Sequence, residues 1–211
     1  MENFTDHRTN RIAFWAMACI VLYGIVCAMG VLSPLLSHET QTLIVFLTFV
    51  PWLVYLFCHF FFLLRIWEEI PREFARTTPE MAAGLALVPF FHLYWQFVAF
   101  LGLYQDMNKS MQAYGVETRF DTAFVRFVCI AWVILFVLLH VFVVVAIAMV
   151  MPSAMASVMA GEESSQFEPP IVLTVFGLLI NLVNTALTIA IYWITYKKVS
   201  EFIDIKSNVG Q

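Results

Sequence analysis

Charged residues are scarce in this sequence. Asp, Glu, Lys and Arg make up 12% of the 211 residues, and hydrophobic residues make up 62%. An ordinary soluble domain contains about 25% charged residues. The apolar residues also occur in runs that are too long and too uniform for helices with one face in water. This composition excludes an ordinary soluble domain and predicts an all-α integral membrane protein.

Several patterns that carry chemistry are missing as well. The Lys and Arg residues form no basic stripe, which argues against a nucleic-acid partner. The four cysteines lie inside apolar runs and form no C-x-x-C pair, so we expect neither a disulfide nor a zinc site. The sequence contains no G-x-S-x-G, Walker loop, H-E-x-x-H or dinucleotide-binding glycine pattern. We therefore predict no catalytic residues and no enzymatic activity.

Four apolar segments are long enough to cross a bilayer, which takes about 20 helical residues for roughly 30 Å of hydrocarbon. They lie at about 12–36, 42–64, 127–151 and 171–195, and none contains Asp, Glu, Lys or Arg. Proton relays and voltage sensors place such charges at depth, so their absence disfavours an ion-coupled transporter. The chain, 1–211, is predicted to form a single membrane domain.

A fifth apolar segment, within 79–114, differs from the other four. It carries Gly84, Pro89, His92 and Gln96, and Pro89 removes a backbone donor near its middle. Cytoplasmic loops of membrane proteins are enriched in Lys and Arg. With four spans, all eleven Lys and Arg lie on one side together with both termini, whereas a fifth crossing divides them between the two sides. We therefore predict four spans, cytoplasmic termini, and a broken helix that is either re-entrant or interfacial.

Local signals predict the shape of this segment. Thr78, Pro79 and Glu80 form a typical helix start, with a capping hydroxyl, a proline in the first turn and an acid near the positive helix end. Residues 88–91 are the expected break, and a second helix is expected from Phe91 to Tyr114, ending at Gly115. The preceding residues 67–76 mix both charge signs with aromatics, which is typical of a solvated helix at headgroup level.

The run from Pro89 to Phe100 reads P-F-F-H-L-Y-W-Q-F-V-A-F, and Gly102-Leu103 and Asp106-Met107-Asn108 follow it. This pattern resembles one found in uncharacterised small bacterial multi-pass inner membrane proteins. There it reads P-F-F-N-x-Y-W-x-F-x-A, followed by G-L and an acidic-x-Asn ending, so that His92 stands at the position of the motif's Asn. The resemblance implies location in a bacterial inner membrane and implies no activity.

The last apolar segment has one polar face. Its polar and small residues recur at a spacing of three and four, which places them on one side of a helix. They are Thr174, Gly177, Asn181, Asn184, Thr185, Thr188 and Tyr192. Such a face is expected to point away from lipid. It has two interpretations, namely packing through interhelical hydrogen bonds or the lining of a polar cavity.

Three histidines add to this candidate polar site. His59 shares a helical face with Trp52 and Tyr55, and His92 and Gln96 lie in the broken helix. His92 and His140 reach a similar depth if the broken helix is re-entrant, and paired histidines can hold haem iron. A membrane histidine that bonds to a neighbouring side chain is the simpler interpretation, so no cofactor or metal is predicted.

These observations favour a non-enzymatic membrane component, a subunit or assembly factor that acts through helix packing in a homo-oligomer or larger complex. One alternative is a small channel or carrier for a neutral or amphipathic solute, which would use the tip of the broken helix together with Asn181, Asn184 and Thr188. A second alternative is a membrane haem protein that uses His92 and His140.

Overall fold

The structure is a computed structural model that describes residues 2–32, 38–88, 91–117, 120–160 and 171–209. The described residues are mostly helical and contain no strand, which confirms the all-α prediction. The long helices are α1 (Glu2–Leu32), α2 (His38–Glu68), α6 (Thr122–Ala160) and α7 (Ile171–Val209). The short ones are α3 (Pro79–Leu85), α4 (Phe91–Gln96), the π-helix η2 (Phe97–Gly102) and α5 (Leu103–Ala113).

Helices long and apolar enough to cross a membrane are present in three places among the described residues. They are His7–Gly30, Phe46–Glu68 and Val175–Val209, and a shorter apolar helical stretch covers Thr122–Leu138. The helices extend beyond the apolar segments predicted from sequence, because α1 begins at Glu2 and α7 continues to Val209. At about 1.5 Å per residue, the 39 residues of α7 span about 58 Å, which exceeds the hydrocarbon thickness of a bilayer.

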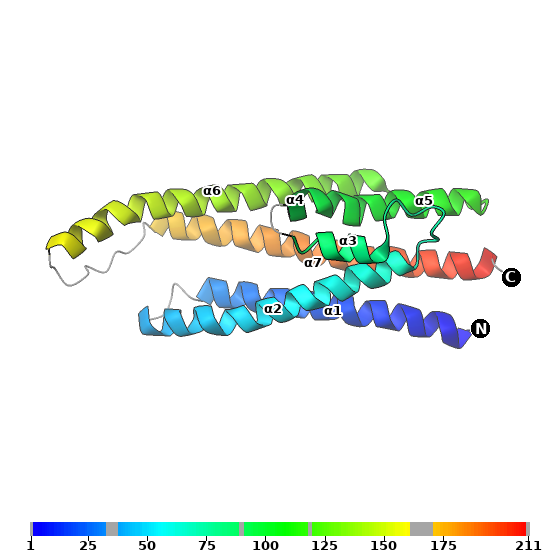
Figure 1. Cartoon of the computed structure of the whole chain (residues 1–211), viewed down its shortest axis with the longest axis horizontal. Helices are drawn as coiled ribbons and strands as arrows, with labels where there is room; N and C mark the ends of the chain where they lie inside the picture. Colours follow the sequence, from blue (N-terminus) through cyan, green and yellow to red (C-terminus); the bar gives the residue numbers. More distant parts are fainter. Residues whose placement is uncertain (1, 33–37, 89–90, 118–119, 161–170, 210–211) are drawn as a thin grey trace.

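The long helices form two hairpins, α1 with α2 and α6 with α7, and both chain termini lie at the same end of the molecule (Figure 1). Helix α1 packs against both α2 and α7, which joins the hairpins, while α6 packs against α7 and η2. The short helices lie in the half of the molecule that carries the termini. There, α3 packs against α2 and runs opposite to α4, η2 and α5 (Figure 1). We call this half the terminus end and the other the far half.

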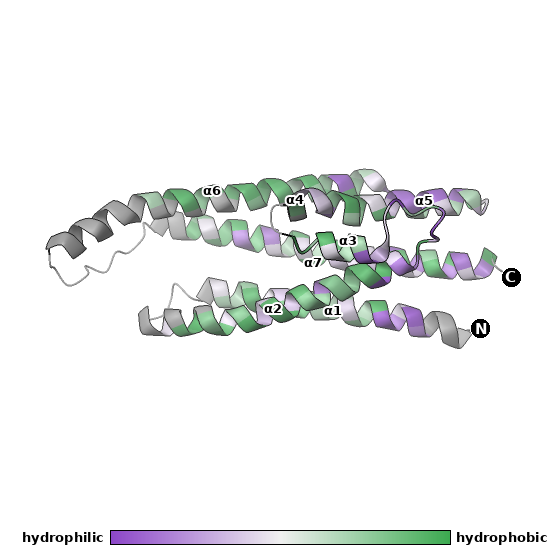
Figure 2. Cartoon of the chain, viewed as in Figure 1, coloured by the Kyte–Doolittle hydropathy of each residue, from purple (hydrophilic) through white to green (hydrophobic). Residues whose placement is uncertain are grey.

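Polar residues gather at the terminus end, whereas apolar residues continue along the helices into the far half (Figure 2). The closely packed core also belongs to the terminus end, where its fully buried side chains come from α1, α2, α5 and α7. The largest include Trp67, Phe62, Leu103, Met107, Met111, Val199 and Phe202. By contrast, large apolar side chains of α2, α6 and α7 are exposed along the far half, among them Phe46, Val50, Val144 and Leu182.

The predicted boundaries of the broken helix agree with the structure at the described positions. Thr78 Oγ1 accepts a hydrogen bond from the backbone N–H of Met81, and Pro79 opens α3. The pKa of the Glu80 carboxyl is lowered, first by the backbone N–H at this helix start and then by the Thr78 side chain. Helix α5 ends at Ala113, and Gly115 follows with a φ of 75°, a conformation that favours glycine.

The helix predicted over residues 67–76 is wrong. Helix α2 ends at Glu68, and the following residues form turns in which the N–H of Phe74 donates to the carbonyl of Pro71. Pro71 has no N–H and disfavours a helical conformation in the residue before it, which explains the end of the helix. Trp67 is not at a solvated surface either, because its side chain is fully buried.

Candidate functional site

The polar face predicted for the last apolar segment lies on α7 and points toward α1 and α2. Thr188 and Tyr192 are buried, and Asn181, Asn184 and Thr185 are partly buried. The side chain of Thr174 lies outside the described residues. Gly177, the small residue of the predicted face, lies against α6 instead, because a Cβ atom there would meet the ring of Phe142 at 3.2 Å.

Asn184 connects this face to α1. Its Nδ2 donates a hydrogen bond of 2.8 Å to the hydroxyl of Tyr23. The two threonines beside it bond within their own helix, since Thr188 Oγ1 donates to the carbonyl of Asn184 and Thr185 Oγ1 donates to that of Asn181. Thus the two threonine hydroxyls of the polar face bond to carbonyls of α7, and Asn184 makes the hydrogen bond to α1.

Tyr192 connects α7 to α2. Its hydroxyl shares a hydrogen bond of 3.0 Å with the hydroxyl of Tyr55 and a further hydrogen bond with Nδ1 of His59. Tyr192 and His59 are each 2% exposed, so these hydrogen bonds lie in the interior. Trp52, which was expected on the same face as Tyr55 and His59, is instead 42% exposed and stacks on Phe49.

These side chains surround a small cavity between α1, α2, α4, η2, α6 and α7. Its volume is about 50 Å³. We call its polar lining the buried polar cluster, which consists of Tyr23, Tyr55, His59, Gln96, Thr188 and Tyr192. Apolar side chains of α6, including Val128 and Trp132, complete the wall. A space of this size suits a few water molecules and is small for an organic solute.

The structure brings together five of the residues singled out in the sequence, namely Tyr55, His59, Gln96, Thr188 and Tyr192. Asn181, Asn184 and Thr185 lie farther along α7 and are absent from this lining. The side chains of His92 and His140 lie outside the described residues, so the depth match of this pair stays a prediction. Among the described residues, no group of three or more His, Cys, Asp and Glu side chains is arranged to hold a metal ion.

Two buried tryptophans hold the broken helix in place. Trp95 Nε1 donates a 2.9 Å hydrogen bond to the carbonyl of Ala82, which joins α4 to α3. Trp67 Nε1, at the end of α2, donates a 3.1 Å hydrogen bond to the carbonyl of Ala99 inside the π-helix. Buried backbone carbonyls require partners, and these indole groups satisfy two of them. The first contact closes the broken helix on itself, and the second holds it against α2.

A buried ion pair fixes the next part of the segment. Asp106 is fully buried and accepts hydrogen bonds from the backbone N–H, Nε and Nη2 of Arg76 at 2.8–3.1 Å. Gly102 makes room for that arginine, because a Cβ atom there would meet Arg76 Cδ and Nε at 3.2 Å. Two residues of the motif, Gly102 and Asp106, thereby hold Arg76 and the turn that precedes α3.

Asn108 completes the contacts of the motif. Its Nδ2 donates to the carbonyl of Phe120 at 2.9 Å, and its Oδ1 accepts from the N–H of the same residue at 2.8 Å. These paired bonds fix α5 to the start of α6. The structural role of Trp95, Gly102, Asp106 and Asn108 was not predicted from the sequence. Nor was the part of Tyr23 in the buried polar cluster, since its partner Asn184 lies 161 positions away.

Protein-family models, curated proteins and solved structures were compared with the chain, and none matches it.

Proposed function

We propose that this chain is a non-enzymatic component of a bacterial inner membrane, a subunit or assembly factor that acts through helix packing. In this proposal α1, α2, α6 and α7 all cross the membrane, both termini are cytoplasmic, and the segment from α3 to α5 is a re-entrant hairpin. The shared position of the termini and of the polar residues at one end of the molecule supports this orientation.

The observation that carries the proposal is the small size of the interior site. The Tyr192 hydroxyl hydrogen-bonds to both Tyr55 and His59 beside a cavity of about 50 Å³. Sites for small molecules usually measure about 300–1,000 Å³. The polar groups at the centre of the molecule therefore serve the contacts between helices, and a substrate or solute has no comparable space in the buried polar cluster.

The outer surface supports a role in assembly. Large apolar side chains are exposed on each long helix, including Phe14 on α1, Phe46 on α2, Phe127 on α6 and Phe176 on α7. Such surfaces suit contact with lipid or with helices of other subunits. We infer that part of this surface contacts identical chains or other membrane proteins.

The decisive experiment is native mass spectrometry of the full chain, extracted in a mild detergent or a polymer disc. We expect a mass above that of one 24.2 kDa chain, from identical subunits or a co-purified membrane protein. A chain that is monomeric under every extraction condition would contradict the proposed role. A fluorescent or enzymatic reporter fused after Gln211 tests the cytoplasmic placement of the C-terminus, and an extracytoplasmic reporter signal would reverse the orientation.

A small carrier or channel remains the alternative, because Gln96 of the broken helix and Thr188 of α7 meet at one cavity. Proteoliposomes containing the chain should then shrink and swell with neutral solutes such as glycerol faster than protein-free vesicles. We expect equal rates in both preparations. A purified protein with a haem absorption band would instead support the haem alternative.

A further inference from the structure

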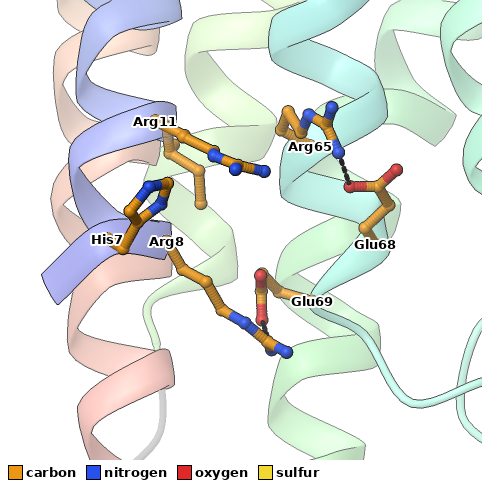
Figure 3. Close-up of a pocket in the computed structure, with 7 residues that line it drawn as sticks. His7, Arg8, Arg11, Arg65, Glu68 and Glu69 are labelled. Carbon is orange, nitrogen blue, oxygen red and sulfur yellow. Dashed lines mark hydrogen bonds and ion pairs between the residues drawn. The ribbon is translucent and has the colours of Figure 1, made fainter. Parts of the chain in front are cut away.

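Two adjoining clefts lie between α1 and α2 at the terminus end, apart from the buried polar cluster. The first has a volume of about 450 Å³, and its charged or titratable lining consists of His7, Arg8, Arg11, Arg65, Glu68 and Glu69 (Figure 3). The second, of about 420 Å³, shares His7, Arg11 and Arg65 and adds Phe14 and Trp15. The two clefts therefore form one continuous surface that is cationic at one end and aromatic at the other.

The cationic part has more positive than negative groups. Arg8 pairs with Glu69 at 3.2 Å, and Arg65 pairs with Glu68 at 2.7 Å. Arg11 has no ion pair among the described residues, and its guanidinium group points across the cleft toward Arg65 (Figure 3). The guanidinium group of Arg65 is turned toward Glu68 (Figure 3), and an anion bound between the two arginines would offset the repulsion of their positive charges.

Arg65 has further capacity to bind an anion. Its Nε atom is buried and makes no hydrogen bond to any residue in the described part of the chain. Its Nη1 atom bonds Glu68, but both side chains of that pair are more than a third exposed, so the pair is weak and easily rearranged. A phosphate group is well suited to such a site, because arginine binds phosphate through parallel hydrogen bonds.

The aromatic part begins where α1 becomes apolar. Phe14 is 63% exposed, and Trp15 stacks on Phe61 of α2 with ring centroids 5.0 Å apart. The apolar stretch of α1 runs from His7 to Gly30, so the clefts lie at the polar boundary of a helix that is able to span a membrane. An occupant that fits both parts has an anionic head and an apolar chain.

We propose that these clefts bind an anionic phospholipid, with its phosphate between Arg11 and Arg65 and an acyl chain along Phe14 and Trp15. Basic pockets between membrane helices recognise anionic headgroups in this way. The inference rests on the membrane placement of α1 and α2 given under Proposed function, and it is independent of subunit number. Glu68 competes with the phosphate for Arg65 and therefore limits the affinity.

The test uses the full chain in detergent, titrated with dioleoyl phosphatidylglycerol or dioleoyl phosphatidylcholine and followed by native mass spectrometry. We expect the anionic lipid to bind more tightly than the zwitterionic one. Arg11→Gln and Arg65→Gln should each weaken binding of phosphatidylglycerol about fivefold, since one basic residue near the membrane surface contributes about a factor of five. Arg126→Gln, which removes an exposed arginine of α6, is the matched control and should leave the affinity unchanged.

A substitution that is expected to raise the lipid affinity makes the test stricter. Glu68→Gln should strengthen binding of phosphatidylglycerol because it releases Arg65 from its ion pair. Thermal unfolding of each variant shows whether the fold is retained, and all the altered side chains are partly or fully exposed. Equal affinities for the two lipids, or equal losses in Arg11→Gln and Arg126→Gln, would overturn the proposal.

Inorganic phosphate separates a lipid from a free anion. Phe14→Ala should weaken binding of phosphatidylglycerol and leave binding of inorganic phosphate unchanged. If millimolar phosphate displaces phosphatidylglycerol and Phe14→Ala has no effect, the site binds free anions and the lipid assignment is wrong. These measurements do not depend on the mass of the assembly, so their failure is distinct from failure of the proposed assembly role.

Discussion

The terminus end and the far half of the molecule use apolar residues differently. At the terminus end, Trp67, Leu103, Met107 and Phe202 are completely buried. In the far half, Phe46 is 72% exposed and Val144 is 64% exposed. Water drives burial only where water is present, and inside a bilayer an exposed apolar side chain is already in an apolar solvent. The position of the packed core therefore indicates where this chain excludes water by its own contacts.

The buried polar contacts of the two halves also differ, since those at the terminus end include a charged pair. The terminus end contains a buried carboxylate with four hydrogen bonds from Arg76. Toward the far half, the connection between α1 and α7 is a neutral hydrogen bond from Asn184 to Tyr23. Charged buried pairs lose more than neutral bonds when one partner is removed. The comparison therefore predicts large mutational effects at the terminus end and small ones beyond it.

The largest effect is expected for Arg76→Met. This change leaves Asp106 buried without its guanidinium partner and should lower the free energy of unfolding by about 2–3 kcal/mol. The value is below that of a fully buried pair because the Arg76 side chain is 33% exposed. Unfolding by SDS in mixed micelles measures the change. Lys109→Met is the control, since Lys109 lies 3.4 Å from Asp106 but is 61% exposed, and an equal loss in both variants would contradict the assignment.

Alanine substitutions of two glycines should change the free energy of unfolding by intermediate amounts, in opposite directions. Gly84→Ala in α3 should raise the free energy of unfolding by about 0.5–1 kcal/mol, because alanine favours a helix and nothing lies within 4 Å of the new Cβ atom. Gly102→Ala should instead lower it by about 1 kcal/mol, because Arg76 is displaced from its pair with Asp106. Equal stabilisation in both variants would show that Arg76 moves aside freely.

A smaller effect is expected for the double change Asn181→Leu with Asn184→Leu. Hydrogen bonds between membrane helices contribute about 0.6 kcal/mol on average. Asn184 Oδ1 is also buried without a hydrogen-bond partner among the described residues, so leucine removes an unsatisfied acceptor together with the bond to Tyr23. The variant should keep its fold and its assembly mass, with a loss of about 0.6–1 kcal/mol. Complete loss of folding would mean that the α1–α7 contact is as critical as the terminus end.

The smallest effect concerns pH. Because the folded-state pKa of Glu80 is lowered from its ordinary value of 4.5, its ionised form contributes stability above that value. This contribution is lost as the pH falls through the lowered pKa. The difference in stability between the unaltered chain and Glu80→Gln should therefore shrink as the pH falls below about 4.5. A difference that does not change with pH would exclude the contribution of Glu80 to the start of α3.

The features predicted from the sequence are those with local signals. The Thr78 cap, the helix start at Phe91 and the stop at Gly115 follow from residue types within a few positions. The pairing of Arg76 with Asp106 was not predictable, because the partners lie 30 positions apart and join only through the fold. The helix expected over residues 67–76 does not form because Pro71 disfavours a helical conformation there, whatever the charge pattern of the stretch. The number of spans stays a prediction.

The π-helix η2 makes the length of the broken helix as important as its residue types. A π-turn contains one residue more than an α-turn, and one residue rotates all later side chains by about 100° around a helix. Trp95 precedes η2 and faces α3, whereas Asp106 follows it and faces Arg76. A continuous α-helix of the same sequence would misalign one of these two side chains. Deletion of one η2 residue, such as Val98, would thus let the segment continue as an α-helix with both anchors still in register, whereas an α-turn at full length would separate them.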